Sequence, residues 1–405
     1  MFKKGGIFLK TVGIICEYNP FHLGHKKQLD IVRSTYGEDC AIVCLMSGSF
    51  VQRGMPAIFD KSLRARAAIT CGADLVLELP VTSALSSAEG FAAGGVQILS
   101  GLCDALCFGT ETGDVPSLMQ TARTLLSPEF SDVLHLELET GKSFPAARQA
   151  ALERMGADAS LLTNPNDILA VEYCKAIIAQ NSSLIPLPIH RMGSYHDTAP
   201  DPRNPSATAI RHQILNGESW KEFVPEEVRG LFENAPKFDL SAGERAMLYR
   251  LRTMTDEEFE ALPYGSEGLW RRLMHASRSH AGLEDILTAT KSKRYTRSRL
   301  DRMVMCAFLG ITAQDLETSV PYTRILAFSN AGRTILKNAK GCVPLLHIGE
   351  THENPYWSLE QRCDDLHGLF RLESPQCAGG ESQRRVILSP AGSAASPPAE
   401  QNRSE

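Results

Sequence analysis

The sequence predicts an α/β protein in which a doubly wound parallel sheet is followed by an α-helical domain. Between about residue 11 and residue 224, short apolar runs alternate with segments of helical periodicity, which is the pattern of βαβ units. Polar loops that contain glycine follow several of these runs, and the carboxyl ends of parallel strands are where such sheets bind ligands. From about residue 225 only helical periodicity continues, which predicts the second domain.

The composition is that of an ordinary globular protein. The 405 residues are 43% hydrophobic and 22% charged, with a net charge of −5, so there is room for two or three domains with their own cores. Any contact with nucleic acid therefore requires a local basic patch. No apolar run reaches the roughly 18 residues of a membrane span, and residues 1–10 are expected to form a short extension, not a signal peptide.

The 11 cysteines are scattered, and several lie inside apolar runs. This distribution is typical of small core residues in a reducing cytoplasm and not of a disulfide framework. Because no Cys-x-x-Cys pair occurs, we expect no structural zinc site, and no metal-ligating residues are predicted.

The first strand and the helix after it enclose the most informative stretch. Val12 to Cys16 is an apolar run, Asn19-Pro20 ends it, and His22-Leu-Gly-His25 opens a helical pattern. Free N–H groups at a helix start attract anions, and two imidazoles three residues apart can reach the same phosphate. Gly24 would let the backbone approach the ligand. The stretch therefore predicts a phosphate site.

The His-x-Gly-His pattern resembles the signature of nucleotidyltransferases and class I aminoacyl-tRNA synthetases, which activate an acid or a phosphate by attack on the α-phosphate of ATP. Two surface histidines at a helix start are the alternative. The position directly after a first strand favours nucleotide binding, because structural context confirms such motifs.

The remaining elements follow in order. Buried strands are predicted at 41–46, 74–80 and 104–108, a helix at 61–71, a small-residue helix at 84–99, and glycine-bearing loops at 47–56 and 109–114. Helices are expected over most of 116–160, at 168–179 and after the N-cap Ser206, with an edge strand at 184–190 because it contains two prolines. Residues 243–317 are helical, 325–346 form a small mixed unit, and the chain beyond 371 is expected to be disordered.

Seven segments together resemble one family. They are 17–25, 46–54, 72–80, 108–111, 165–169, 205–211 and 293–297, and in order and spacing they are similar to the bacterial tRNA(Met) cytidine acetate ligase family from about residue 11 to about residue 350. The resemblance implies that acetate and ATP give acetyl-adenylate and pyrophosphate, and that N4 of the wobble cytidine of elongator tRNA(Met) is then acetylated. Acetate, ATP, Mg²⁺ bridging the phosphates, and this tRNA are the implied substrates and cofactors.

The resemblance also implies site residues. The ATP-binding stretch consists of Ile15, Cys16, Glu17, Tyr18, Asn19, Pro20, Phe21, His22, Leu23, Gly24, His25, Lys26, Lys27 and Gln28, and the single ATP contacts are Gly109, Asn166 and Arg191. His22 and His25 are the expected catalytic residues, since they would stabilise charge on the phosphate oxygens. Thr208 and Arg211 would hold the β- and γ-phosphates. Asp167 stands where the family has asparagine, Thr110 where serine is common and Leu23 where asparagine is common, and Asp167 is left out of the site.

Several of these residues also fit ordinary structural roles. Ser206 and Asn166 could be helix N-caps, Gly109 a plain turn, and Arg191 or Arg211 a surface ion pair or cap. Glu111 and Asp114 could be a catalytic pair but are expected to be solvated loop acids. Glu78 is expected to be structural or a metal-side ligand, and Lys61 and Arg53 could neutralise phosphate or the tRNA backbone.

The run from Lys291 to Arg302 contains six basic residues around one tyrosine. Lys291, Lys293, Arg294, Tyr295 and Arg297 are predicted to bind tRNA, with a base stacked on the tyrosine. A solvated basic helix face is the alternative.

The sequence is thus interpreted as a cytoplasmic, ATP-dependent acetate ligase acting on tRNA. The expected divisions are an extension at 1–10, a nucleotidyltransferase-like domain at 11–224, a mainly helical tRNA-contacting domain at 225–370 and a tail at 371–405. Two alternatives are an adenylyltransferase that makes a nucleotide cofactor, and a non-catalytic RNA-binding module with a vestigial nucleotide pocket. The sequence indicates no oligomeric state.

Overall fold

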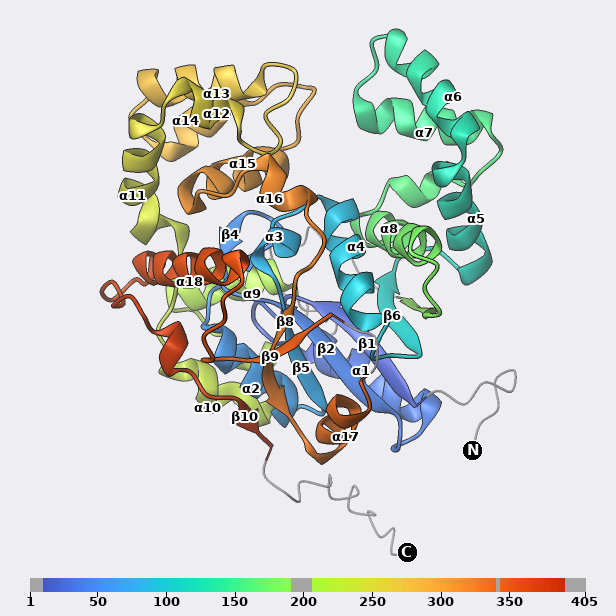
Figure 1. Cartoon of the computed structure of the whole chain (residues 1–405), viewed down its shortest axis with the longest axis vertical. Coiled ribbons are helices and arrows are strands. Elements are labelled where there is room, and N and C mark those ends of the chain that lie inside the picture. Colours follow the sequence, from blue (N-terminus) through green and yellow to red (C-terminus); the bar gives the residue numbers. More distant parts are fainter. Residues whose placement is uncertain (1–9, 191–205, 340–342, 390–405) are drawn as a thin grey trace, which may run out of the picture.

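The computed structural model describes residues 10–190, 206–339 and 343–389. A twisted sheet lies at the base of the molecule, and two groups of helices rise above it on either side of a gap (Figure 1). Within the described ranges, no helix has the length and apolar character needed to span a bilayer.

The centre of the sheet is parallel and doubly wound, as predicted. Its strands are β1 (Thr11–Cys16), β2 (Ala41–Ser47), β5 (Leu75–Leu79), β6 (Ala105–Thr110) and β7 (Ile185–His190). They lie in the order β5-β2-β1-β6-β7, so the chain leaves β1 first toward one edge and then toward the other. The carboxyl ends of β1 and β6 flank the point where the order reverses, which is where such sheets bind ligands. Among the described strands, the proline-containing β7 pairs with β6 alone and is an edge strand.

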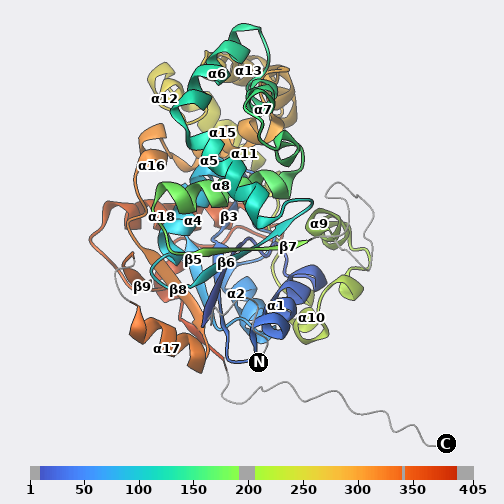
Figure 2. The same cartoon turned by 90° about the vertical axis from the view of Figure 1, so that its right-hand side faces the viewer.

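Helices cover both faces of this sheet because the strand side chains are apolar on both sides. The first face packs against α1 (Leu23–Tyr36), α2 (Lys61–Thr70), α9 (Ala207–Asn216) and α10 (Glu226–Glu233). The second packs against α4 (Ala88–Leu99), α5 (Val115–Leu126), α8 (Pro165–Ala179) and α17 (Asn330–Asn338). Figure 2 shows α1, α2 and α10 on one side of the strands and α4 and α8 on the other.

The helical periodicity of residues 243–317 is confirmed. The helices are α11 (Leu240–Thr253), α12 (Asp256–Glu260), α13 (Leu269–Ser279), α14 (Leu283–Thr290), α15 (Arg297–Leu309) and α16 (Ala313–Glu317). Their buried leucines and methionines form a core of their own. The short helix α3 (Val81–Ala84) precedes α4, and α6 (Pro128–Glu139) and α7 (Phe144–Arg154) extend α5 into the second group of helices.

The C-terminal part of the chain contradicts two predictions. Strand β8 (Thr323–Phe328) does not belong to a separate mixed unit, because it pairs antiparallel with β5 and extends the main sheet. Strands β9 (Leu345–His347) and β10 (Ile387–Leu388) pair with β8. The predicted disorder from residue 371 is therefore wrong as far as residue 389. That segment contains few apolar residues, but it is held by a strand and by buried ion pairs.

Those ion pairs form a buried network around two cations. Arg324 contacts Glu78, Glu360 and Glu381 at 2.8 Å each, and it is 2% exposed. Lys61 is fully buried and lies 3.0 Å from Glu78, 2.6 Å from Asp364 and 3.0 Å from Glu381. Asp364 and Glu360 are on α18 (Pro355–His367), while Glu381 is in the segment that was predicted to be disordered. The network thus joins α2, β5, β8, α18 and the C-terminal segment.

Replacing Arg324 with methionine is expected to reduce the free energy of unfolding by about 3–5 kcal/mol. The reason is that, among the described residues, only Lys61 and Arg384, which pairs with Glu381, would then face four buried carboxylates, and breaking a buried ion pair leaves uncompensated charge. Urea unfolding measures the change. Arg66→Met on the exposed side of α2 is the matched control and should stay within about 0.5 kcal/mol of wild type. A loss for Arg324→Met no larger than the control's would show that the network does not stabilise the fold.

The same network predicts a dependence of stability on pH. Burial, together with the negative charges of Glu78 and Asp364, raises the pKa of Glu360 to about 7. A carboxyl whose pKa is raised by folding contributes stability below about pH 4.5, and this is lost as the pH rises through about 7. Glu360→Gln cannot titrate. We therefore expect wild type to lose roughly 3 kcal/mol relative to this variant between pH 4.5 and pH 8, measured by urea unfolding. If the difference in unfolding free energy between wild type and Glu360→Gln does not change with pH, the raised pKa of Glu360 is contradicted.

Candidate active site

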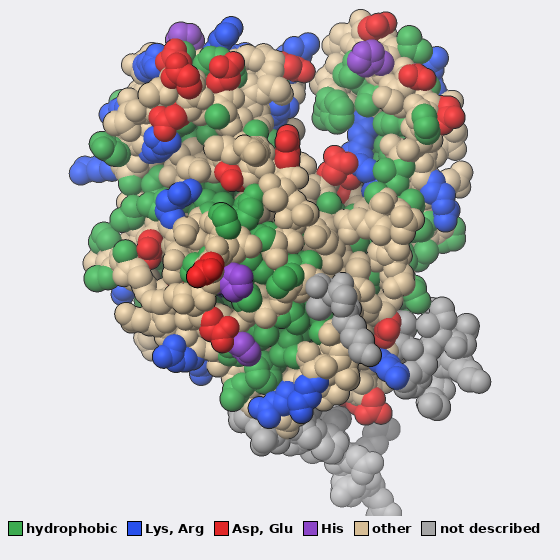
Figure 3. All heavy atoms as spheres, in the orientation of Figure 1, with side chains coloured by type: hydrophobic (Ala, Val, Ile, Leu, Met, Phe, Trp, Pro, Cys, Tyr) green, Lys and Arg blue, Asp and Glu red, His purple; other side chains and the backbone are tan. Residues whose placement is uncertain are grey.

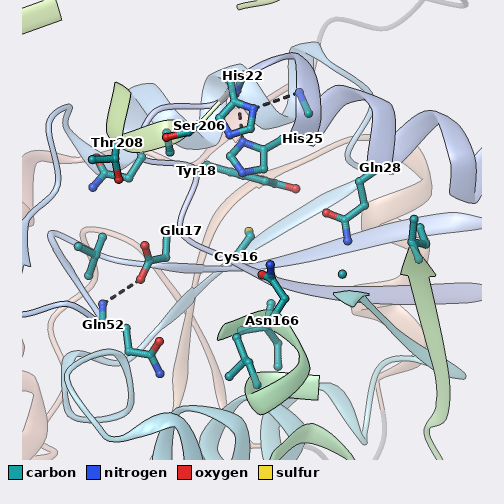
Figure 4. Close-up of a pocket in the computed structure, with 18 of the residues that line it drawn as sticks. Cys16, Glu17, Tyr18, His22, His25, Gln28, Gln52, Asn166, Ser206 and Thr208 are labelled. Carbon is teal, nitrogen blue, oxygen red and sulfur yellow. Dashed lines mark hydrogen bonds between the residues drawn. The ribbon is translucent and has the colours of Figure 1, made fainter. Parts of the chain in front are cut away.

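A cavity of about 380 Å³ lies at the carboxyl ends of β1, β6 and β7. Its walls come from the turn between β1 and α1, the first turns of α8 and α9, and a short hairpin after β2. The hairpin consists of β3 (Phe50–Val51) and β4 (Met55–Pro56). Figure 4 shows residues from these separate segments facing one another across the cavity.

The two motif histidines lie together at the start of α1. Their rings are stacked, with centroids 3.7 Å apart and planes 27° apart. His22 is the N-cap of the helix, and its Nδ1 accepts the N–H of Gly24 at 3.0 Å, while Nδ1 of His25 accepts the N–H of His22 at 3.3 Å. A neutral ring that accepts at Nδ1 carries its proton on Nε2. Each ring is therefore set to present Nε2 as a donor, which suits phosphate oxygens.

Gly24 lines the cavity, where its backbone was predicted to approach a ligand. It also has a role that was not predicted. A Cβ at this position would lie 2.9 Å from Cε1 and 3.0 Å from Nδ1 of His22, so the missing side chain makes room for the His22 ring. Although His22 is only 2% exposed, it lines the cavity together with His25.

The charge of the lining is positive in a chain whose net charge is negative. Lys27, Arg53 and Arg211 line the cavity, and Glu17 is the one carboxylate among the described lining residues. The N-termini of α1, α8 and α9 add the positive ends of three helix dipoles. Among the described residues, no three His, Cys, Asp or Glu side chains lie together as ligands for a metal ion. The cavity is therefore suited to a polyphosphate.

The start of α9 supplies the predicted pair Thr208 and Arg211. Both line the cavity, and Nη2 of Arg211 donates to Oγ1 of Thr208 at 3.1 Å. Nη1 of Arg211 donates at 2.7 Å to the carbonyl of Asn19 in the β1–α1 turn. Ser206 caps α9 by accepting the N–H of Ala209. Arg211 thus braces the histidine turn and faces the cavity.

The first turn of α8 brings Asn166 to the cavity beside Gly109. Glu111 accepts the side-chain amide of Asn166 at 2.5 Å, so this acid positions Asn166, and it is not among the residues that line the cavity. Asp167 is buried and accepts the N–H groups of Glu111 and Thr112. Burial would raise the pKa of Asp167, but hydrogen bonds from Thr110 and Thr112 outweigh it and lower the pKa. Asp114 is the N-cap of α5.

The predicted ATP-binding stretch is divided between the cavity and the core. Most of its residues line the cavity, namely Ile15, Cys16, Glu17, Tyr18, Asn19, His22, Leu23, Gly24, His25, Lys27 and Gln28. Pro20 and Phe21 are buried away from it, and Lys26 pairs with Asp30 on the surface of α1. Arg191 lies outside the described residues. Lys61 is wholly buried in the ion network, so it cannot neutralise a phosphate.

The predicted tRNA-binding segment is partly structural. Tyr295 is 7% exposed, with the Arg299 guanidinium 4.8 Å from its ring centroid, so the prediction that a base stacks on it is wrong. Arg297 binds both carboxylate oxygens of Glu284 at 2.7 Å. Lys291, Lys293 and Arg294 are exposed and line a second, open hollow. Ser143 and Pro145 at the start of α7 line the same hollow from the other group of helices.

Arg64, which was not predicted to belong to the site, connects the loops that form it. This fully buried guanidinium donates to the carbonyls of Glu17 at 2.7 Å and Ser47 at 3.0 Å, and also to those of Gly48 and Phe59. It thereby fixes the loops after β1 and β2 relative to α2. Burial lowers the pKa of Arg64 to about 10. The only signal in the sequence was a basic residue on the apolar side of α2.

The fold and this cavity define a nucleotide-binding α/β protein of the nucleotidyltransferase class. The HIGH Nucleotidyl Transferase family matches residues 9–379. The chain is 36% identical to the tRNA(Met) cytidine acetate ligase of Acetivibrio thermocellus, over 84% of this chain and 88% of that protein. It is also 36% identical to the tRNA(Met) cytidine acetate ligase of Caldicellulosiruptor saccharolyticus, over 89% of this chain and 94% of that protein.

Solved structures of a protein from Thermotoga maritima also resemble this chain. Thermotoga maritima TmcAL in its apo form superposes with a TM-score of 0.84 at 30% identity, over 94% of this chain and 99% of that one. The form of that protein bound with alpha-thio ATP superposes with a TM-score of 0.83 at 29% identity. The chain therefore belongs to the HIGH nucleotidyl transferase family and, within it, to the tRNA(Met) cytidine acetate ligases.

Gly24→Ala is expected to weaken ATP binding by roughly 10- to 100-fold, because the new methyl group must displace the His22 ring, and misplaced site groups cost this much. Isothermal titration calorimetry with ATP measures the change. Gly230→Ala on α10, where an added Cβ meets nothing within 4 Å, is the control and should bind like wild type. If the two variants bind ATP with equal affinity, the position of the His22 ring does not affect ATP binding.

Proposed function

We propose that this protein activates acetate with ATP and transfers the acetyl group to N4 of the wobble cytidine of elongator tRNA(Met). The observation that carries the proposal is the pair of stacked, Nε2-donating histidines beside Lys27, Arg53 and Arg211 in one cavity. Family membership supports it, as does the nucleotide analogue bound by the Thermotoga maritima relative. A tRNA substrate places the reaction in the cytoplasm.

In the first step, an oxygen of acetate attacks the α-phosphate and pyrophosphate leaves. Acetate is already an anion and needs no base, so the protein positions the reactants and stabilises negative charge. The Nε2–H groups of His22 and His25 would donate to the α-phosphate oxygens as charge develops. Thr208 and Arg211 would hold the β- and γ-phosphates, while Gly109 and Asn166 would contact the nucleoside.

Magnesium fits this site as a companion of the triphosphate. Mg²⁺ commonly keeps several waters and binds substrate phosphates, so in a cavity whose described lining has one carboxylate the phosphates and waters would hold it, and Glu17 would not be required. When bound, Mg²⁺ would neutralise phosphate charge.

The tRNA would lie across the hollow between the two groups of helices. Figure 3 shows this gap on the face of the molecule, with Lys and Arg side chains near its walls. Lys291, Lys293 and Arg294 line the part of it formed by both groups. Because these cations are exposed, we expect them to contact the phosphates of the RNA backbone. Such contacts position the RNA and carry no sequence information.

Acetate-dependent exchange of pyrophosphate into ATP tests the first step. We expect wild type to catalyse it without tRNA, and His25→Asn to reduce the rate by about 100- to 1,000-fold, the usual effect of removing one charge-stabilising donor. Exchange supported by other acids but not by acetate would contradict the substrate. Formation of a dinucleotide would favour the cofactor-making alternative, and RNA binding without any turnover would favour the binding module.

The tRNA surface is tested with the double variant Lys293→Ala and Arg294→Ala. The salt dependence of the affinity for tRNA should become shallower, because each lost phosphate contact reduces the slope of log K against log salt by about 0.7–0.9. Filter binding at several salt concentrations measures the slope. Arg333→Ala with Lys337→Ala, on α17 at the opposite end of the molecule, is the matched control. The same slope in both double variants would rule out this surface.

A further inference from the structure

We infer that the carboxylate of Glu17 takes the proton from N4 of the cytidine during acetyl transfer. This inference rests on the proposed function and assigns a residue to its second step. Unlike acetate, the exocyclic amine of cytidine carries protons, so the transfer requires a group that accepts one.

The position of Glu17 is set by its backbone and by one carboxylate oxygen. Arg64 holds its carbonyl at 2.7 Å, and Oε1 accepts the backbone N–H of Gln52 at 2.9 Å. Within the part of the chain that the structure describes, no hydrogen bond engages the second oxygen, which we infer acts on the substrate. Figure 4 shows Glu17 below the two histidines, on the side of the cavity where Gln52 lies.

The helical region formed by α11–α16 lies on the same side of the cavity as Gln52. Gln52 belongs to the β3–β4 hairpin, and its carbonyl accepts Nη1 of Arg302 on α15 at 3.4 Å. Gly54 in the same hairpin touches the α15 backbone so closely that a Cβ would lie 2.5 Å from the nitrogen of Arg302. The hairpin that binds Glu17 therefore contacts α15, the helix that follows the predicted tRNA-binding segment.

The other proton acceptors in the described lining are poorly placed. The Nδ1 atoms of His22 and His25 are occupied by backbone N–H groups. Burial raises the pKa of the Cys16 thiol and of the Tyr18 hydroxyl well above their usual values. His190 ends β7, two strands away from β1, a separation of about 10 Å at the usual strand spacing.

The step balances without any further reactant. N4 attacks the carbonyl carbon of acetyl-adenylate, a C–N bond forms, the C–O bond to the phosphate breaks and AMP leaves. The proton lost from N4 goes to the Glu17 carboxylate and from there to water. Glu17 would thus act as a general base only in the second step.

The test separates the two steps in Glu17→Gln, whose amide oxygen can still accept the Gln52 N–H. Purified variant is given synthetic acetyl-adenylate and tRNA without ATP, and transfer is followed in a single turnover. We expect transfer to fall at least about 100-fold, the usual contribution of a general base. Acetate-dependent pyrophosphate exchange, and trapping of the adenylate by hydroxylamine, should fall far less, by no more than about fivefold.

Two further variants complete the design. Glu38→Gln, an exposed residue between α1 and β2, should leave both steps intact, and His190→Gln tests the rival acceptor. Transfer by Glu17→Gln at the wild-type rate, or loss of exchange equal to loss of transfer, would overturn the assignment. Loss of transfer only in His190→Gln would overturn it in favour of that residue. Wild type without acetate-dependent exchange would refute the proposed function itself, and this inference with it.

Discussion

The attraction between Lys61, Arg324 and the four carboxylates around them is the interaction on which the rest of the structure depends. These groups are buried at the carboxyl end of β5 and the amino end of the antiparallel β8, where water cannot compensate an unpaired charge. The network attaches the C-terminal segment to the parallel sheet. It also reaches the loop after β2, where Ser49 donates to Asp364 at 2.5 Å and a Cβ on Gly48 would collide with Glu78. The loop that builds one wall of the cavity is therefore anchored by charges outside the cavity.

Arg64 extends this anchoring to the motif turn. It lies one helical turn after Lys61 on α2, and its donors reach carbonyls in the loops after β1 and β2. Two arginines therefore fix the histidine turn. Arg64 donates to the carbonyl of Glu17, and Arg211 donates to the carbonyl of Asn19. Rigid support of this kind is what allows a site to stabilise a transition state without reorganising.

The cavity and the helical region are joined by the β3–β4 hairpin. Its residues line the nucleotide cavity on one side and contact α15 on the other. In the proposed two-step reaction, an adenylate formed in the cavity would have to meet a large RNA. The hairpin connects the cavity with the helical region that carries the proposed RNA surface.

The sequence by itself determined the parallel sheet, the strand–turn–helix at its start, and the family, because these depend on patterns within about 30 residues and on ordered motifs. It also pointed to most of the residues that meet in the cavity. Only the tertiary structure decided that Lys61 is buried, that Tyr295 is covered by Arg299, and that residues up to 389 complete the sheet. Each of these depends on a partner brought close by the fold, in some cases from far along the chain, such as Asp364 for Lys61. Such pairings leave no local pattern, because one charged residue looks the same in a sequence whether its partner lies in water or in the core.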